Sequence, residues 1–384
     1  MKVKLGDIFE IGSGGTPSKS HPEYYKGNIP WVKTGDLKSE YLYEVEDFIS
    51  EEGLKNSSAK MYEENTVLIA MYGATIGATS ILKLSACTNQ ACAAFKENEK
   101  VIPEYLYYFL RSQKERFVKD GVGGAQPNIS AGYLKKVEME IPLLENQKEI
   151  IGILDKTSEI ISRMDQEIRL LDNLIKARFV ELFGDAVDNP MEWEKKQLQD
   201  IVTDDCTISY GIVQTGNDQD VGVPVFRPVD IVNRTPKLEE LKKTTEEISN
   251  KYKRTVLKGR EMLITVRANI ADTCIVGEEF KGCNVGRGIV PIRTKEDIMV
   301  LEFLKYLIDS KHLNDDIKSK AKGITLIQLN MEDLREVELI IPPVERQKSF
   351  VEFAKQVDKS KVVVQKALNE TKLLFDLLMQ KYFG

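Results

Sequence analysis

The chain has 384 residues, of which 42% are hydrophobic and 30% are charged, and its formal net charge at pH 7 is −6. This length exceeds the size at which a single hydrophobic core usually stops growing, so we expect two domains. The ordinary composition excludes a disordered or membrane-spanning chain, since no run approaches roughly 18 uninterrupted apolar residues, and the acidic balance lacks the basic signature of most nucleic-acid binders.

The N-terminus and the cysteines indicate the compartment. The first residues, MKVKLGDIFEIGS, contain no apolar stretch of the kind that a secretory signal requires, so we expect a cytoplasmic location. The two histidines are isolated and no two cysteines have CxxC spacing, which argues against a metal site and against a disulfide framework. We expect no bound metal. Reduced, structural thiols are expected at Cys87, Cys92, Cys206, Cys274 and Cys283.

The first unusual stretch is the glycine-rich segment GSGGTP at residues 12–17. A phosphate-binding P-loop needs GxxxxGK followed by Ser or Thr, but lysine and glycine occur here in the reverse order, as Lys26-Gly27. A dinucleotide-binding GxGxxG also fails, because Pro17 stands where the third glycine belongs. The segment therefore predicts an irregular loop suited to close backbone approach and hydrogen bonding.

The chain contains an internal repeat of about half its length. The segment LKKVEMEIPLLENQKEI at 134–150 returns as LREVELIIPPVERQKSF at 334–350, an offset of 200 residues. Upstream, LGDI at 5 matches LQDI at 198, IPWVKTGDL at 29 matches VPVFRPVDI at 223, and VLIAMYGATIG at 67 matches MLITVRANIAD at 262, with offsets of 193, 194 and 195. The repeat predicts two similar domains related by a pseudo-twofold axis.

Each repeat ends in a predicted long amphipathic helix. Apolar residues recur at steps of three and four after each Ile-Pro pair, and a helix of about 39 residues spans roughly 58 Å. This narrow seam favours another helix as its partner, so we expect an antiparallel coiled coil between the two; ordinary core packing is the alternative. The seam positions are Ile150, Leu154, Thr157, Ile161, Met164, Ile168, Leu171, Ile175, Arg178 and Leu182, and then Phe350, Ala354, Val357, Lys361, Val364, Leu368, Thr371, Phe375, Leu378 and Tyr382.

The repeat and the helices together predict four segments. We expect globular domains at 1–144 and 185–344, called the first and second heads below, and spacer helices at 145–184 and 345–384. If the helices pair antiparallel, the heads lie at opposite ends of the pair.

No catalytic constellation stands out. Two isolated histidines support no Ser/His/Asp set, and no NPPY-like or DPPY-like amino-methyltransferase motif occurs. Asp188 with Glu194 and Lys196 matches a nuclease-like pattern, but such matches arise by chance among 60 acidic and 54 basic residues. NPMEW at 189–193 is more simply the loop that leaves the first long helix. We therefore expect no enzymatic activity.

Polar turns recur at matched positions in the two heads. Lys33 aligns with Arg227, and an aspartate follows each cation by three residues. A second pair of turns carries Tyr72 and Thr75 in the first head and Arg267 and Asn269 in the second. Arginine and asparagine suit bidentate contacts with guanine and adenine, whereas tyrosine and threonine suit stacking, phosphate and thymine-methyl contacts. Ordinary polar turns are the alternative interpretation.

Taken together, these motifs resemble a known family, the specificity subunits of type I restriction-modification systems. The resemblance covers essentially the whole chain and rests on LGDIFEIGSGGTPS, YYKGNIPWVKTGDL, the VLIAMYGATIG turn, TNQACAAF, GGAQPNIS and the two long helices. It implies two target recognition domains of α/β (α+β) fold in tandem. Each would read one half of a bipartite site in the major groove of double-stranded DNA, and the helices would fix the number of unread base pairs between the halves.

The resemblance also implies partners. Subunits of this family are non-catalytic and bind two modification subunits, which carry S-adenosylmethionine and methylate adenine N6. Cleavage requires restriction subunits that use ATP and magnesium. The resemblance therefore implies no cofactor on this chain and no membrane partner.

The same resemblance and the matched turns nominate DNA-binding residues. In the first head they are Gly15, Thr16, Ser18, Trp31, Lys33, Thr34, Tyr72, Thr75, Asn89, Gln90 and Gln126. In the second head they are Tyr210, Gln214, Arg227, Arg267, Asn269, Asn284 and Arg287. The second head departs from the first, since GSGGTPS becomes TISYGIVQTGN and TNQACAAF becomes CNVGRGIVPI, so we expect the two half-sites to differ.

The charge distribution limits how this chain alone can bind DNA. Residues 40–52 contain six acids and no base, so this segment must point away from DNA. We infer that much of the phosphate contact comes from the methylating partners. A non-enzymatic scaffold whose two heads bind protein is the alternative function.

Overall fold

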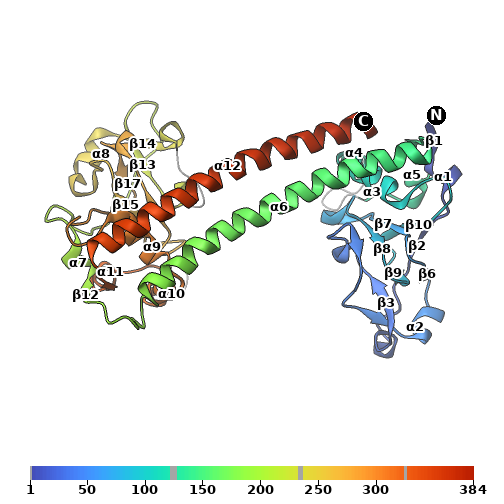
Figure 1. Cartoon of the computed structure of the whole chain (residues 1–384), viewed down its shortest axis with the longest axis horizontal. Helices are drawn as coiled ribbons and strands as arrows, with labels where there is room; N and C mark the ends of the chain where they lie inside the picture. The colour runs from blue at the N-terminus through green and yellow to red at the C-terminus, as the bar shows by residue number, and fades with distance from the viewer. Residues whose placement is uncertain (1, 122–127, 232–236, 324–326) are drawn as a thin grey trace. The chain divides into compact units, whose positions relative to one another are not determined.

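The computed structural model describes residues 2–121, 128–231, 237–323 and 327–384. The chain forms two compact units, of which one comprises Met1–Gln166 with Gln365–Gly384 and the other Glu167–Val364. Each unit therefore holds one head, the beginning of one long helix and the end of the other, and Figure 1 shows these elements.

The first unit combines short helices with strands. Its strands are β1 (Lys2–Lys4), β2 (Ile11–Ser13), β3 (Ile29–Val32), β4 (Tyr41–Leu42), β5 (Phe48–Ile49), β6 (Met61–Tyr62), β7 (Val67–Ala70), β8 (Thr79–Leu82), β9 (Ala86–Thr88), β10 (Cys92–Phe95) and β11 (Glu138–Glu140). Its short helices are α1 (Leu5–Ile8), α2 (Glu51–Lys55), α3 (Pro103–Ser112), α4 (Lys114–Asp120) and α5 (Ala131–Leu134).

These strands form two sheets and a ribbon. One sheet has the order β2-β10-β7-β8-β4 and the other β5-β3-β9-β6, while β1 pairs with β11. The parallel pairs are β3 with β9 and β4 with β8, and the others are antiparallel. Along β7, Val67 and Ile69 contact the apolar cluster under α3, while Leu68 and Ala70 contact a second cluster, as the two-residue period of a strand requires. The first sheet is thus covered on both faces.

The second unit repeats this plan, with fewer strands among its described residues. Its strands are β12 (Lys195–Gln197), β13 (Val223–Phe226), β14 (Lys242–Thr244), β15 (Met262–Thr265), β16 (Thr273–Ile275), β17 (Asn284–Val285), β18 (Ile289–Ile292) and β19 (Glu338–Ile340). Its short helices are α7 (Leu198–Ile201), α8 (Glu246–Asn250), α9 (Leu301–Ile308), α10 (Lys311–Ser319) and α11 (Met331–Arg335). The sheets are β16-β15-β18 and β14-β13-β17, with a ribbon of β12 and β19.

The repeat predicted from the sequence is confirmed by its main elements. The antiparallel trio β8-β7-β10 matches β16-β15-β18, and the parallel pair β3/β9 matches β13/β17. The helix α9 packs on β15 and β16 as α3 packs on β7 and β8. Mixed sheets with packed helices confirm the α/β (α+β) class for both heads. Strands matching β2, β4 and β6 are absent from the part of the second head that the structure describes.

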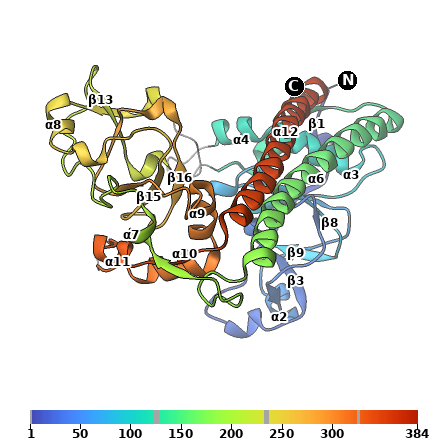
Figure 2. The ribbon, with the colours of Figure 1, turned by 60° about the vertical axis from the view of Figure 1, so that its left-hand side comes forward.

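The two long helices are α6 (Leu144–Phe183) and α12 (Val344–Phe383), and they run antiparallel, as Figures 1 and 2 show. Every predicted seam position is buried or half-buried. In the first unit Lys372 pairs with Asp165 at 3.5 Å, and in the second Lys361 pairs with Asp172. The predicted antiparallel pairing is therefore confirmed.

The far end of each long helix is anchored by aromatic side chains. In the second unit Phe183, at the end of α6, meets Phe303 with ring centroids 4.8 Å apart and Phe350 at 5.6 Å. In the first unit Phe383, at the end of α12, meets Tyr105 at 5.2 Å and Phe109 at 6.2 Å. Edge-to-face aromatic pairs of this kind add about 0.5–1.5 kcal/mol beyond the apolar area they bury.

The near end of each long helix is held by a buried glutamine. The Oε1 atom of Gln147 accepts from Ile102 N at 2.9 Å, and its Nε2 atom donates to Lys100 O and Pro142 O. Gln347 repeats this, accepting from Val300 N at 2.9 Å and donating to Ile298 O and Pro342 O. Because Ile102 and Val300 precede α3 and α9, each glutamine ties a long helix to the first turn of its head's main helix.

We expect Gln347→Leu to lower the free energy of unfolding of the second unit by about 2–3 kcal/mol, because two buried backbone groups and one part-buried group lose their partners at about 1 kcal/mol each. Urea unfolding followed by Trp193 fluorescence, in a Trp31→Phe background, measures this change. Gln356→Leu, at an exposed position on the same helix, is the control and is expected to have little effect. A loss below about 1 kcal/mol for Gln347→Leu would contradict this role.

None of the helices in the described ranges is both long enough and apolar enough to cross a membrane. All five cysteines are free. Burial raises the pKa of Cys87 and of Cys274 to about 12, so these thiols stay protonated and packed at neutral pH.

Candidate nucleic-acid interface

In the first head, the glycine-rich loop lies against the turn after β9. Gly15 N donates to Thr88 O at 2.9 Å, and the Thr16 hydroxyl donates to Gln90 Oε1. A Cβ at Gly14 would stand 1.8 Å from Thr88 O, so only glycine fits there. The glycines therefore serve close backbone approach, as predicted, and they bring two polar loops together.

Two further turns join this surface. Met71 N donates to Ala91 O at 2.8 Å, and Ile129 N donates to Met71 O at 3.0 Å. The turn that starts at Tyr72 is thereby held between the turn after β9 and the segment that begins at Asn128, whose backbone bridges to Tyr72. Tyr72 is 43% exposed and Gln90 is also exposed, so both side chains can be reached by a ligand, although Gln90 Oε1 already accepts from Thr16.

The second head brings the matching loops together with three equivalent backbone bonds and one further bond, from Arg287 N. Ile212 N donates to Val285 O and Arg287 N donates to Ile212 O, both at 2.8 Å. Val266 N donates to Gly288 O at 2.8 Å and Leu329 N donates to Val266 O at 3.0 Å. The loops carrying Tyr210, Arg267, Arg287 and Gln328 therefore converge just as the loops of the first head do.

Three side chains form a hydrogen-bonded line across these loops. Gln328 accepts from Arg267 Nε at 2.7 Å and from Nη2, and it donates through Nε2 to the Tyr210 hydroxyl at 2.6 Å. Since a guanidinium has five N–H donors, Arg267 keeps donors for a ligand while Gln328 fixes its plane. Sequence reasoning predicted Tyr210 and Arg267 but missed Gln328 and its counterpart Asn128. These two residues lie 200 positions apart, so the repeat could have identified them as a matched pair.

The matched cations have a partly different role from the predicted one. Arg227 donates to Asp230 through Nε at 3.0 Å and through Nη2 at 2.7 Å, and the side chain of Asp230 is only 3% exposed. Lys33 pairs with Asp47, whose hydrogen bond raises the pKa of Lys33. Both cations are therefore neutralised in part by the protein.

The repeated aspartate explains why this motif occurs twice. Asp36 accepts from Lys33 N at 2.7 Å, and Asp230 accepts from Arg227 N at the same distance. Each aspartate thus closes a single 3₁₀ turn, at Thr34–Asp36 and Pro228–Asp230. Local turn geometry accounts for the cation-to-aspartate spacing without a ligand.

Three predicted contact residues, Gly15, Trp31 and Asn284, are buried, so direct DNA contact is corrected to a supporting role. The amide of Gly15 donates to Thr88 O and its carbonyl accepts from Trp31, so its polar atoms are used within the loop. Trp31 is 6% exposed and its indole Nε1 donates to Gly15 O at 3.1 Å, which holds the glycine-rich loop. Asn284 is fully buried and exchanges hydrogen bonds with the Thr255 and Ser249 hydroxyls at 2.7 and 3.0 Å. The polar side-chain atoms of Trp31 and Asn284 form hydrogen bonds within the protein.

The remaining predicted residues lie on the surfaces of the loops, except Gln126. Gln126 lies outside the described residues. The Asn89 side chain accepts from Ala91 N at 3.1 Å and shapes its own turn. Ser18, Gln214, Asn269 and Arg287 are exposed, and Thr34 and Thr75 are half-buried.

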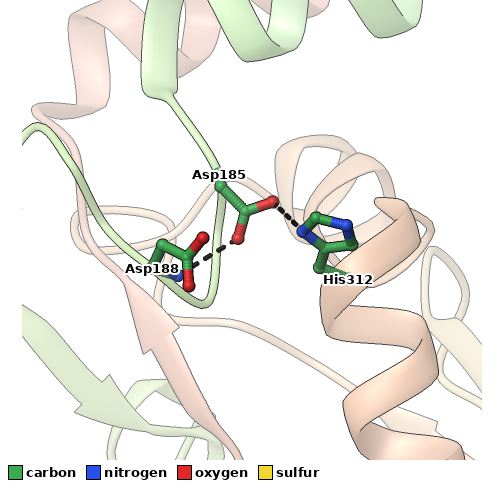
Figure 3. Close-up of side chains that lie close together, drawn as sticks. All are labelled: Asp185, Asp188 and His312. Carbon is green, nitrogen blue, oxygen red and sulfur yellow. Dashed lines mark hydrogen bonds and ion pairs between the residues drawn. The ribbon is translucent and has the colours of Figure 1, made fainter.

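Among the described residues, one group has the composition of a metal site. Asp185, Asp188 and His312 lie together, as Figure 3 shows. Asp185 pairs with His312 Nδ1 at 2.5 Å and accepts from the amides of Val187 and Asp188, which lowers the pKa of Asp185 although burial opposes the shift. The cluster thus fastens the loop after α6 to α10. Lys196 pairs with Glu194 at 3.4 Å and not with Asp188, so the nuclease-like pattern is not assembled.

The comparisons with known proteins match this architecture. The model of the type I restriction modification DNA specificity domain matches twice, over residues 1–171 and 190–371. The chain therefore belongs to the family of type I restriction-modification specificity proteins and contains two copies of its domain.

Relatives extend the match to the whole length. The chain is 26% identical to the MjaIX specificity subunit of Methanocaldococcus jannaschii, over 98% of this chain and 91% of that one. It is 23% identical to the EcoBI specificity subunit of Escherichia coli, over 96% and 81%. The chain is a DNA specificity subunit of a type I restriction-modification complex, as its family indicates.

Solved structures share the fold. A chain from a type I R-M system, described for its complex assembly and conformational transition, superposes with a TM-score of 0.66 at 18% identity, covering 100% of this chain and 97% of that one. The S subunit from M. genitalium superposes with a TM-score of 0.56 at 15% identity, covering 100% and 96%. As a specificity subunit the chain is the non-catalytic component, and the cofactors of the complex reside on the modification and restriction subunits.

Proposed function

We propose that each head reads one half of a bipartite DNA site through its converging loops. Residues 1–144 form the first recognition domain and residues 185–344 the second. The helical segments 145–184 and 345–384 set the number of unread base pairs and dock two modification subunits. Restriction subunits that use ATP and magnesium join the complex for cleavage, and the complex acts in the cytoplasm.

The convergence of matched loops with different side chains carries this proposal. Backbone bonds of the same pattern hold the loops in both heads, so the framework is constant. At equivalent places it displays Tyr72 and Gln90 in the first head but Arg267 and Arg287 in the second. Because base identity is read by side chains at groove edges, these differences favour two different half-sites.

The surface of the long helices supports docking of partner subunits. The apolar residues of the seam face the other long helix. Other large apolar side chains on both helices are exposed, and exposed apolar patches are typical of surfaces that bind another protein. On α6 they are Leu144, Ile160, Leu170, Leu174 and Val180, and on α12 they are Val362, Val363, Leu373, Leu374 and Leu377.

Replacing Arg267 with Ala tests base reading by the second head. One bidentate arginine contact accounts for about 1–3 kcal/mol of base discrimination, so methylation of the cognate site should fall by roughly 5- to 150-fold and one half-site should become degenerate at one position. Sequencing that maps methylated adenines, in cells with the complete system, measures both changes.

The controls separate reading from folding. Arg254→Ala removes the same charge from an exposed position in the same head and should leave both half-sites unchanged. Arg267→Lys keeps the charge but loses the planar fork, so it should resemble Arg267→Ala. A pattern in which all three variants weaken methylation equally, with no change in either half-site, would count against base reading by Arg267.

A further inference from the structure

The hydrogen-bonded line of Arg267, Gln328 and Tyr210 in the second head has a fixed direction. Arg267 has donors only, so the amide atom of Gln328 that lies 2.7 Å from its Nε must be the oxygen. The opposite orientation of this amide would set donors against donors. The Nε2 atom of Gln328 therefore points the other way and donates to the Tyr210 hydroxyl at 2.6 Å.

The Tyr210 hydroxyl is the acceptor in this bond, so its own proton is not used by Gln328. The Tyr210 side chain makes no other hydrogen bond among the described residues. Its ring packs against the main apolar cluster of the second unit, which holds the hydroxyl in one place. Because Tyr210 is half-exposed, its O–H group can donate to a ligand.

Arg267 also has only donors left for a ligand. Of the five N–H groups of a guanidinium, Gln328 accepts one from Nε and one from Nη2, which leaves three. No carboxylate pairs with Arg267 within the described ranges, in contrast to Arg227, which is held by Asp230. Arg267 is half-exposed. The line therefore presents donors and no acceptor at both of its ends.

The backbone around Gln328 keeps the line in place. Gln328 N donates to Lys322 O at 3.0 Å, and Lys322 N donates to Gln328 O at 2.9 Å. The next residue, Leu329, is fully buried and donates its amide to Val266 O at 3.0 Å, directly before Arg267. Because the line is already formed in the free protein, little side-chain freedom is lost on binding, which favours affinity.

The first head has no such line at the matched positions. A Cβ at Gly211 would stand 2.0 Å from the carbonyl oxygen of the last residue of β17, and one at Gly14 would stand 1.8 Å from that of β9, so these glycines match. Within the described part of the first head, no side-chain hydrogen bond joins the three matched residues. They are Ser13, Tyr72 and Asn128, in place of Tyr210, Arg267 and Gln328.

An array of donors without acceptors selects its ligand by chemistry. In the major groove guanine presents two acceptors, O6 and N7, and no donor. Adenine and cytosine present amino groups, and thymine presents one acceptor beside a methyl group. The line thus fits an acceptor-only partner. A DNA phosphate has the same acceptor-only chemistry, so the experiments below must distinguish it from a guanine edge.

We propose that Gln328 is a positioning residue that makes the second head read guanine. It holds Arg267 so that the free donors of the guanidinium meet O6 and N7 of one guanine. It also makes Tyr210 donate to an acceptor on a neighbouring base pair, and not accept from an amino group there. This role of Gln328 rests on the proposed function, in which the converging loops of each head enter the DNA groove.

Mapping of methylated adenines in cells with the complete system tests the base that Arg267 reads. The position that Arg267→Ala relaxes should be a guanine in the half-site of the natural chain. On synthetic duplexes, 7-deazaguanine at that position removes N7. It should lower methylation by the natural complex about tenfold and by the Arg267→Ala complex less than about twofold. An equal loss in both complexes, or another base at the relaxed position, would overturn the inference.

Gln328→Glu tests the direction of the line, because it reverses the polarity at Tyr210 and keeps a partner for Arg267. A carboxylate accepts from both side chains, so the phenol oxygen would face the DNA as an acceptor. At the position that Tyr210→Phe relaxes, the base preference should shift about tenfold towards adenine or cytosine, whose amino groups donate. A merely structural role of Gln328 would not change which base is preferred.

Two controls accompany this variant. Gln199→Glu adds the same charge at an exposed position on α7 of the same head and should leave both half-sites unchanged. The half-site read by the first head should stay the same in every variant, which shows that the chain and its complex are intact.

The outcomes separate this inference from the proposed function. If exchanging residues 185–340 for those of another family member changes half of the site but Gln328→Glu shifts no base preference, Gln328 is structural only, and the proposed function stands. Uniform weakening by Arg267→Ala, with a shallower dependence on salt, would assign the line to a phosphate and also overturn the inference. If the exchange leaves the site unchanged, the proposed function itself fails.

Discussion

Replacing residues 1–140 with the first head of another family member changes one half of the methylated DNA site and leaves the other half intact. This result is expected because the loops that display Tyr72 and Gln90 belong to the first unit, whereas those that display Arg267 and Arg287 belong to the second. Mapping of methylated adenines before and after the exchange measures it. The effect is large, since a whole half-site is replaced rather than one base.

The exchange must respect the end of α12, which packs on the first head. Tyr105 and Phe109 contact Phe383, and Tyr108 contacts Phe375 with ring centroids 6.3 Å apart. A donor head should therefore have aromatic residues at these three positions. The reciprocal exchange of residues 185–340 is the matched control and should change only the other half. A site that stays the same after both exchanges would contradict reading by the heads.

Lengthening both long helices by one heptad increases the unread gap by about three base pairs. Seven residues add about 10 Å at 1.5 Å per residue, and base pairs rise by about 3.4 Å. The insertions belong after Asp165 in α6 and before Thr371 in α12, because this choice keeps the Asp165–Lys372 pair on one side and the Asp172–Lys361 pair on the other. The distance between methylated adenines on the two strands reports the gap.

A heptad in α6 alone is the control. It shifts Asp172 and Ile175 out of register with α12, so we expect loss of stability and of methylation rather than a longer gap. An unchanged gap in an active double insertion would show that the helices do not set the spacing.

The sequence predicted the long helices correctly because their information is local and repeated. The three-and-four spacing of apolar residues places every seam position on one side of a helix, and a seam of this length needs a partner helix. The 200-residue repeat indicated that the partner is the second copy of the same helix in this chain. Both the seam and the antiparallel pairing are found in the structure.

The site was predicted less well because its information is distributed among distant loops. Lys33 and Arg227 recur with an aspartate three residues on, which resembles a reading motif, but each aspartate caps its local turn. The cations are held by carboxylates of the protein, Arg227 by Asp230 and Lys33 by Asp47. Gln328 went unnoticed, since its bond to Arg267 joins residues 61 positions apart. Trp31 and Asn284 carry recognition-type side chains, yet the fold buries both.

The glycine-rich stretch shows the division between the two kinds of information. By itself the sequence determined the duplication, the pairing helices and the family, since these depend on patterns that recur along the chain. Only the tertiary structure decided that Gly14 is required by the approach of Thr88 and that four loops meet in each head. These features depend on which distant segments touch, and hydrophobic patterning and turn chemistry constrain such contacts only weakly.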